Sequence, residues 1–481
     1  MLKKVIIFIS LLFLILVIIL LFNTFRSAST QTQYAAKPAP KVTDSALAHL
    51  KQAISFKTIS YGEVSRFDSV QFLGFQRFLQ QAYPRMHATM QLERVEGYTL
   101  WFTWKGTDTT LNPIIIMAHQ DVVPIEETTR DQWTVEPFGG EVKDGFIWGR
   151  GTTDDKINLI AICEAVEKSQ GNGFTPKRTH HFIFGHDEEI GGKGAKEVAR
   201  RMEANGLIAD LLMDEGGIIT KEKLPGITKP VALLGTSEKG YLSLVLTAEA
   251  MGGHSSMPEK ETSVDILSNA IVKLRSKPFP VRFTEPMMGL MASVGPEMPF
   301  FQRMAFANPW LFKGLIAGIY EKTGAGNAML HTTLVPTIIE GGIKDNVVPS
   351  QVKATINIRL LPGDSVDAVI KKVEEIINDK RVKVAKHNGA VAEASSVTPV
   401  KSFGYEKMDR IMKQSYPDIL TSPFLMIGAT DSRHFGKVSS NIIKFSPMID
   451  PIGFHGINER VSIESYQTAL WFFEQLITDN E

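Results

Sequence analysis

The feature that most constrains this sequence is a series of short apolar runs, each followed at once by histidine or acidic residues. Three such segments are 114–121, 179–189 and 211–215. Apolar runs of this length that alternate with helical patterns are typical of buried strands in an open α/β sheet. In such a sheet ligands bind beyond the carboxyl ends of the strands, so we expect the polar residues of these segments to form one site.

The first segment places His119 and Asp121 two residues apart at a strand end. In an extended chain their side chains point the same way, so Asp121 can orient a metal-bound His119 through its second ring nitrogen. Downstream, Asp154 and Asp155 precede a helical pattern at 157–169. Two interpretations stay open for this pair: they cap the helix, or one carboxylate bridges two metals.

The second segment runs through adjacent acids to two glycines, Gly191 and Gly192, which allow close approach of the backbone. Glu188 and Glu189 can act as general base and metal ligand, because successive side chains diverge. Carboxylates and imidazoles without thiolates are typical of a catalytic zinc or cobalt site. The single cysteine, Cys163, excludes a cysteine-rich metal cluster.

The composition indicates a folded protein of two or three domains. Of the 481 residues, 43% are hydrophobic and 22% are charged, which is too apolar for a disordered chain. The 52 Lys and Arg residues balance the 52 Asp and Glu residues, so no net positive charge attracts nucleic acid. We therefore expect no nucleic-acid partner.

The N-terminus carries a long apolar run, residues 5–22, which follows two lysines and is interrupted only by Ser10. As a helix it would span roughly 27 Å, close to the thickness of the hydrocarbon core. We predict a transmembrane signal-anchor at 1–22, with the catalytic body membrane-anchored and outside the cytoplasm; a cleaved signal peptide is the alternative. The polar, proline-containing residues 23–43 would form a flexible stalk.

The remaining chain divides into a catalytic domain and an insertion. Strand-helix alternation over 44–238 resumes over 400–481, so these parts are expected to form one α/β domain with an open mixed sheet. Between them, 239–399 has a β-α-β-β-α-β pattern, typical of a small ferredoxin-like α+β domain. Within it, 286–330 carries six of the eighteen methionines; it is either an irregular packed insertion or a pliable apolar wall for a greasy substrate.

Several motifs resemble the di-zinc metallopeptidase family that includes aminoacylase and carboxypeptidase G. Four of them lie at 119–121, 149–156, 187–192 and 214–217. Three more resemble the branch of carboxypeptidase S and the N-fatty-acyl-amino-acid hydrolase/synthase, and lie at 237–240, 253–256 and 430–433. The resemblance covers about residues 45 to 478. It implies a zinc peptidase domain with an inserted lid or dimerisation domain.

The resemblance also implies a role for each site residue. It suggests four metal ligands and leaves a fifth open between two carboxylates: His119, Asp154, Glu189, His455, and either Asp214 or Glu215. Asp154 would bridge two Zn²⁺ ions, for which Co²⁺ can substitute. Glu188 would be the general base, and Asp121 would steady His119.

In the inserted domain, the resemblance implies that His254 stabilises the developing oxyanion. In some relatives this histidine comes from a second subunit, so a homodimer would be consistent with it. Asn346 and Arg359 match positions that hold the substrate carboxylate; the alternatives are a turn residue and a surface arginine. The other histidines considered match no ligand position and are expected to be structural: His180, His181, His331, His387 and His434.

The resulting hypothesis is a di-zinc metallohydrolase that cleaves an amide bond next to a free carboxylate, which an arginine can pair with bidentately. Its substrate would be a small peptide or an N-acyl amino acid, so the enzyme would be a carboxypeptidase or an N-acyl-amino-acid amidohydrolase. The alternatives are a zinc aminopeptidase or dipeptidase, and a catalytically inactive, membrane-tethered binding protein.

Overall fold

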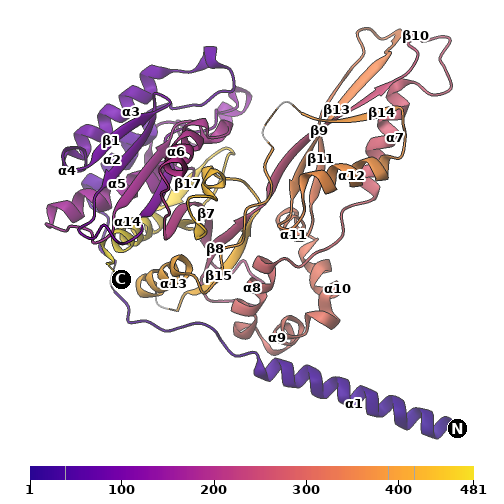
Figure 1. The fold of residues 1–481 in the computed structure, drawn as a ribbon, viewed down its shortest axis with the longest axis horizontal. Coiled ribbons are helices and arrows are strands. Elements are labelled where there is room, and N and C mark those ends of the chain that lie inside the picture. The colour runs from indigo at the N-terminus through magenta and orange to yellow at the C-terminus, as the bar shows by residue number, and fades with distance from the viewer. Residues whose placement is uncertain (38, 388, 390, 417, 481) are drawn as a thin grey trace.

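An eight-stranded sheet forms the centre of the larger lobe of the protein (Figure 1). The computed structural model describes residues 1–37, 39–387, 389, 391–416 and 418–480. In sheet order the strands are β1 (Gln91–Val95), β2 (Thr99–Trp104), β6 (His180–Gly185), β3 (Ile114–His119), β7 (Leu211–Thr220), β16 (Ile442–Ile449), β8 (Val231–Glu238) and β15 (Leu420–Met426). The middle strands β6, β3, β7 and β16 run parallel, and antiparallel neighbours flank them, so the predicted mixed open sheet is confirmed.

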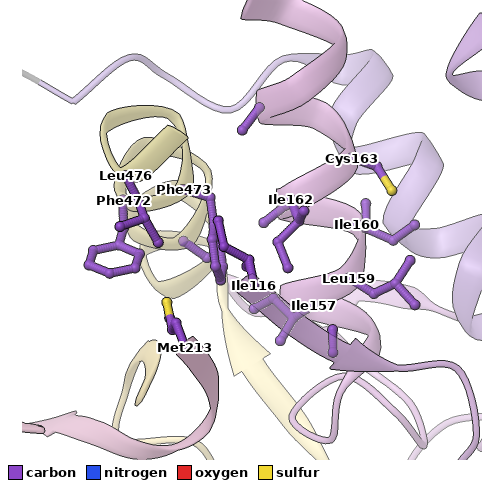
Figure 2. Close-up of a cluster of buried hydrophobic side chains, with 14 of the residues drawn as sticks. Ile116, Ile157, Leu159, Ile160, Ile162, Cys163, Met213, Phe472, Phe473 and Leu476 are labelled. Carbon is purple, nitrogen blue, oxygen red and sulfur yellow. The ribbon is translucent and has the colours of Figure 1, made fainter. Parts of the chain in front are cut away.

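Helices cover both faces of this sheet: α2 (Asp44–Ser55), α3 (Ser69–Ala82), α4 (Pro84–Thr89), α5 (Lys156–Gly171), α6 (Lys193–Ala204), α13 (Phe403–Ser415) and α14 (Ile463–Thr478). Side chains alternate along β3, so Ile116 packs in the core formed with α5 and α14, whereas Ile115 packs in the core that contains α6. Figure 2 shows the first core, in which side chains of α5 and α14 lie beside Ile116 and Met213 of the sheet. The buried strands thereby fix where their carboxyl ends meet.

Smaller elements complete this lobe. A three-stranded sheet consists of β17 (Arg460–Ser462), β5 (Phe146–Trp148) and β4 (Glu141–Lys143). Short 3₁₀ helices lie at Val64–Arg66, Glu127–Gln132, Glu188–Ile190 and Asp431–Phe435.

The smaller lobe is a four-stranded antiparallel sheet with two helices, which confirms the predicted ferredoxin-like insertion. Its elements along the chain are β9 (Gly240–Glu249), α7 (Ser263–Ser276), β11 (Thr333–Gly341), β13 (Gln351–Leu360), α12 (Val366–Ile377) and β14 (Val382–Lys386). The strand order is β11-β13-β9-β14, and α7 and α12 pack on one apolar core with it. An additional two-stranded ribbon, β10 (Gly253–His254) with β12 (Val347–Val348), lies at the outer end of this lobe (Figure 1).

Two neighbouring chain segments connect the lobes. On the outward path β8 continues into β9 through Lys239, and the return path runs beside it. Tyr241 and Ala392 exchange two backbone hydrogen bonds of 2.8 and 2.9 Å, and the backbone N–H of Ser395 donates to the carbonyl of Glu238 at 3.1 Å. The connection is therefore a hydrogen-bonded pair of extended segments, in which Tyr241 and Ala392 form an isolated antiparallel bridge.

The methionine-rich segment 286–330 folds into helices instead of an irregular insertion. They are α8 (Glu285–Val294), α9 (Phe300–Ala307), α10 (Pro309–Tyr320) and α11 (Gly324–Leu330), with a 3₁₀ turn at Gly295–Glu297. Met287 and Met291 are buried in a core that includes Val231 of β8 and Leu420 of β15. These methionines fill the space between the insertion and the edge of the large sheet.

The N-terminal helix α1 (Leu2–Arg26) extends away from the body (Figure 1). It is long and apolar enough to cross a membrane, as either a signal sequence or an anchor would be. After it, the described residues 27–37 and 39–43 form no helix or strand, and part of this segment lies along the body. The Gln31 side chain donates to the carbonyls of Ser293 at 3.1 Å and Thr421 at 3.0 Å.

Candidate metal centre

The Asp154 carboxylate lies between two imidazoles. Its Oδ1 is 2.8 Å from Nε2 of His119, and its Oδ2 is 2.6 Å from Nε2 of His455. His119 ends strand β3, whereas His455 comes from the loop before β17, so residues about 300 positions apart meet at one carboxylate. Because each oxygen faces a different histidine, Asp154 has the geometry of a bridging ligand.

Each histidine has a further carboxylate beside it. Oε1 of Glu215 lies 3.4 Å from Nε2 of His119, and Oε1 of Glu189 lies 3.4 Å from Nε2 of His455. Candidate ligand atoms of His119, Asp154 and Glu189 lie within 4.8 Å of one another, as do those of His119, Asp155 and Glu215. Oε1 of Glu189 is buried without a hydrogen-bond partner. This set of imidazoles, carboxylates and an unsatisfied oxygen fits a pair of divalent cations.

The charges of these groups are strongly coupled. The hydrogen bond to Asp154 and the nearby carboxylate of Glu189 raise the pKa of His455 to about 10. Burial alone would lower the pKa of His119, but the charge of Glu215 and hydrogen bonds to Asp121 and Asp154 hold it well above its usual value. Excess negative charge at the site therefore favours cations, whether protons or metal ions.

Asp214 and Glu215, the two candidates for the last ligand, have different surroundings. The Asp214 carboxylate accepts hydrogen bonds from the backbone N–H of Glu215 at 3.0 Å and of Ser432 at 2.7 Å. Glu215 instead faces His119. The strand β7 continues beyond both residues to Thr220, with a bulge that leaves Glu215 and Gly216 unpaired with β16.

Asp155 is the residue just before α5, at its N-cap position, but its side chain makes no capping hydrogen bond. One of its oxygens is hydrogen-bonded to the Asn158 amide, and the other accepts from the backbone N–H of His119 at 3.3 Å. Asp155 therefore fastens the end of β3 to the loop that carries Asp154. The capping interpretation does not account for either aspartate.

Asp121 joins two parts of the site. Its Oδ1 lies 3.2 Å from Nδ1 of His119, and that nitrogen is also 2.9 Å from the backbone oxygen of Asp121. The two carboxylate oxygens accept the backbone N–H groups of Glu188 and Glu189, both at 3.2 Å, and Ser60 donates to the same carboxylate. One buried side chain thus positions both the histidine ring and the turn that carries the two glutamates.

Glu459 is a supporting residue that sequence reasoning missed. Its buried carboxylate is paired with Arg150 and accepts the backbone N–H groups of Gly151 at 3.0 Å and Thr153 at 2.8 Å. These bonds hold the loop that leads to Asp154. The partners are separated by about 300 residues, so no local pattern signals the interaction.

The carboxylates face a cleft of about 810 Å³ between the two lobes. Glu188 is half-buried in its wall, where burial and the nearby charge of Asp431 raise its pKa well above the usual value. Residues of the smaller lobe also line the cleft, including Tyr241, Arg359 and His387. The guanidinium of Arg359 stacks over the Tyr241 ring at 4.6 Å.

Arg433 also lines this cleft, although sequence reasoning assigned it no role. It lies in the segment 430–433, which drew attention only because it resembles the carboxypeptidase S branch. Arg359 of the smaller lobe and Arg433 of the larger lobe therefore both bring positive charge to the cleft. Among the described residues lining the cleft, none belongs to 286–330, so the structure does not support an apolar substrate wall there.

His254 and Asn346 lie elsewhere. Both are exposed, and they adjoin one another on the β10–β12 ribbon, where the backbone N–H of Ser255 donates to the carbonyl of Asn346 at 3.2 Å. Neither is among the described residues that line the cleft. The structure therefore brings His119, Asp154, Glu189, Glu215, His455, Glu188 and Arg359 together, but not His254 or Asn346.

Comparisons with known proteins identify a family and a fold for this chain. The family model of peptidase family M20/M25/M40 matches residues 115–479. The chain is 38% identical to the probable carboxypeptidase S-like 2 of Dictyostelium discoideum, over 90% of this chain and 84% of that protein. It is 35% identical to the human N-fatty-acyl-amino acid synthase/hydrolase PM20D1, over 90% of this chain and 88% of that protein. The fold matches the M20 family metallo-carboxypeptidase Sso-CP2 from Sulfolobus solfataricus with a TM-score of 0.66 at 17% identity, covering 91% of this chain and 99% of that one.

Gly192 is predicted to be essential for the glutamate turn. Its φ is +64°, and an added Cβ would lie 1.6 Å from Oδ1 of Asp431, so Gly192→Ala must displace the turn or that aspartate. We expect zinc to bind at least about tenfold more weakly, as measured by titration against a competing chelator. Gly206→Ala is the matched control, since Gly206 has a φ of +66° but nothing within 4 Å of an added Cβ. Equal zinc affinities for the two variants would contradict this prediction.

Proposed function

We propose that this chain, which belongs to peptidase family M20/M25/M40, hydrolyses the amide bond next to a free carboxylate, as a carboxypeptidase or an N-acyl-amino-acid hydrolase. The chain is an M20 metallohydrolase. The proposal rests on one observation: the Asp154 carboxylate lies between two histidines, in the same cleft as Arg359. Its substrate would be a small peptide or an N-acyl amino acid.

Two Zn²⁺ ions, or Co²⁺ as a substitute, are the proposed cofactors. His119, Asp154 and Glu215 would hold one ion, and Asp154, Glu189 and His455 would hold the other. Bound there, the ions would polarise the amide carbonyl and make a water molecule more acidic. The buried Glu189 oxygen without a partner and the negative charge around both imidazoles support this arrangement.

Glu188 is the proposed general base. Its carboxylate would take a proton from the attacking water and deliver it to the nitrogen of the leaving amine. Its position in the cleft wall and its raised pKa support that role, because a base that must also act as an acid works best with a pKa near the working pH. Asp121 would keep the His119 ring in place throughout.

Arg359 would select the substrate by pairing with its carboxylate through two parallel hydrogen bonds. Stacking on Tyr241 holds the guanidinium at the cleft and leaves its edge available. Asn346 would contribute to the same carboxylate, and His254 would stabilise the developing oxyanion. Because neither residue lines the cleft of its own chain, both would have to be brought to a cleft from another position.

We propose that a second copy of the chain supplies His254 and Asn346. The two residues lie together at the exposed outer end of the smaller lobe (Figure 1), away from the carboxylates of their own chain. A dimer in which each β10–β12 ribbon reaches the partner's cleft would complete both sites.

We also propose that α1 is an uncleaved membrane anchor and that the catalytic body lies outside the cytoplasm. The two lysines at positions 3 and 4 favour a cytoplasmic N-terminus. The corresponding division of the chain is an anchor at 1–22, a stalk at 23–43, a catalytic domain of 44–238 with 400–481, and an inserted domain at 239–399.

Metal loading tests the choice between Asp214 and Glu215. Glu215→Gln removes a proposed ligand, so we expect about one zinc per chain instead of two, measured by atomic emission after gel filtration. Asp214→Asn should keep both ions, because that side chain accepts backbone hydrogen bonds. The reverse result would make Asp214 the ligand.

In the unaltered chain a chelator should abolish hydrolysis, and added zinc or cobalt should restore it.

Replacing the proposed base tests the reaction. Glu188→Gln should lower kcat about 10²- to 10⁴-fold while KM and zinc content stay unchanged. The rate is measured on an N-acyl amino acid, with Glu127→Gln on the exposed surface as the control. Full turnover by the Glu188 variant would exclude it as the base.

Specificity for the free carboxylate depends on Arg359 in this proposal. The unaltered enzyme should cleave an N-acyl amino acid much faster than the corresponding amide. Arg359→Met should lower kcat/KM for the free acid about 10- to 100-fold and leave the rate on the amide almost unchanged. Arg381→Met, an exposed arginine of the same lobe, should keep the preference. If both substrates are cut equally fast by the unaltered enzyme, carboxylate recognition is wrong.

Complementation tests the dimer. Glu188→Gln and His254→Ala chains should each be nearly inactive alone. Mixed and reassociated, they should recover at most about a quarter of the unaltered activity, because half of the dimers are mixed and each contains one complete site. Activity that stays absent in demonstrably mixed dimers would mean that His254 serves its own chain.

A further inference from the structure

We propose that α9 and α10 form a second membrane-contact surface, embedded in the same bilayer that α1 enters. The surface, called here the α9–α10 face, goes beyond the proposed hydrolysis and beyond a single anchoring helix. It consists of six large apolar side chains: Phe300, Phe301, Trp310, Leu311, Leu315 and Ile319.

These side chains are exposed although they are strongly apolar. Phe301 is 75% exposed, Leu315 is 59% exposed and Trp310 is 58% exposed. On α10 the exposed residues Leu311, Leu315 and Ile319 recur every four positions and form one stripe, whereas Ile316 and Ala317 face the buried core. Trp310 is exposed in the first turn of the same helix, to one side of this stripe. An exposed apolar patch of this kind marks a contact with a partner or a membrane.

The α9–α10 face lies where α1 meets the body (Figure 1). The corner between α9 and α10 holds Asn308, whose side chain accepts a hydrogen bond from Asn23 at 2.8 Å and donates to the carbonyl of Leu20 at 3.3 Å. The rings of Phe25 and Phe300 are 6.2 Å apart. Arg303 donates to the carbonyl of Ser27.

These contacts fix the depth of the face relative to the apolar run. Leu20 belongs to the last turn of residues 5–22, the part long enough to fill the hydrocarbon core. If those residues span a bilayer, the α9–α10 corner stands at the boundary between hydrocarbon and headgroups. Its apolar side chains then have lipid as their nearest neighbour.

The chemistry of the face fits lipid. Tryptophan and phenylalanine are typical of the interfacial zone, and an amphipathic helix with one apolar stripe lies in the plane of that zone. Lys313 is the charged residue within α10, and its ammonium lies 5.5 Å from the Phe283 ring, off the apolar stripe. Because Phe25 of α1 contacts Phe300 of α9, the bilayer that α1 enters would also cover the start of α9.

Trp310 provides an intrinsic probe of this contact. All six tryptophans are described in the structure, and the other five are at most 9% exposed. The full chain is reconstituted into phosphatidylcholine vesicles with brominated acyl chains, which quench fluorescence only on contact. We expect Trp310→Phe to remove more than half of the quenching. Quenching that is unchanged by this substitution would overturn the proposal.

Cysteine labelling tests the face independently and distinguishes lipid from a second copy. The native Cys163 is buried, so Phe301→Cys and the control Val70→Cys, 68% exposed on α3, each introduce one reactive thiol. In nanodiscs that hold one chain, the thiol at position 301 should react with a water-soluble maleimide at least tenfold more slowly than that at position 70. Equal rates would overturn the proposal. If the thiol at position 301 is protected only when several chains share one membrane, the face contacts a second copy of the chain. That result would also overturn the proposal.

Discussion

The structure depends on one carboxylate that two histidines share. Asp154 is buried, and a buried charge persists only where opposite charge and hydrogen bonds compensate for lost hydration. Its two oxygens are satisfied from β3 on one side and from the C-terminal loop on the other, so both ends of the catalytic fold must be in place at once. Asp121 and Glu459 extend the same constraint outwards, because each fixes a backbone segment that carries a candidate ligand.

The site was largely predictable because its residues follow apolar strands. His119 ends one apolar run and Glu189 lies in the turn after another, and parallel strands place their carboxyl ends together. The different surroundings of Asp214 and Glu215 were not predictable, since they depend on a bulge in β7 that turns adjacent side chains differently. Glu459 was missed for another reason: a buried acid that bonds to backbone 300 residues away carries no local pattern.

The fold, too, was predictable where local sequence patterns determine it and not where contacts between distant segments do. The small lobe followed from its alternation of strands and helices, except for β11, whose side chains beyond Leu334 are largely exposed and lack an apolar pattern. The methionine-rich segment gave no periodic signal that distinguished irregular chain from helix. Its helices form because Met287 and Met291 pack on the edge of a sheet built from distant strands.

Hydrogen bonds between the two segments that connect the lobes restrict how the lobes can move relative to one another. Tyr241 and Ala392 bond to each other in both directions, and the Ser395 N–H holds the Glu238 carbonyl in the same way. Sliding one segment along the other would break these bonds. The small lobe is held a second time, because the chain between α7 and β11 forms helices that pack on the edge of the large sheet. Since Arg359 stands on the small lobe and lines the cleft, any change in the angle between the lobes also changes the distance of its guanidinium from the carboxylates on the large lobe.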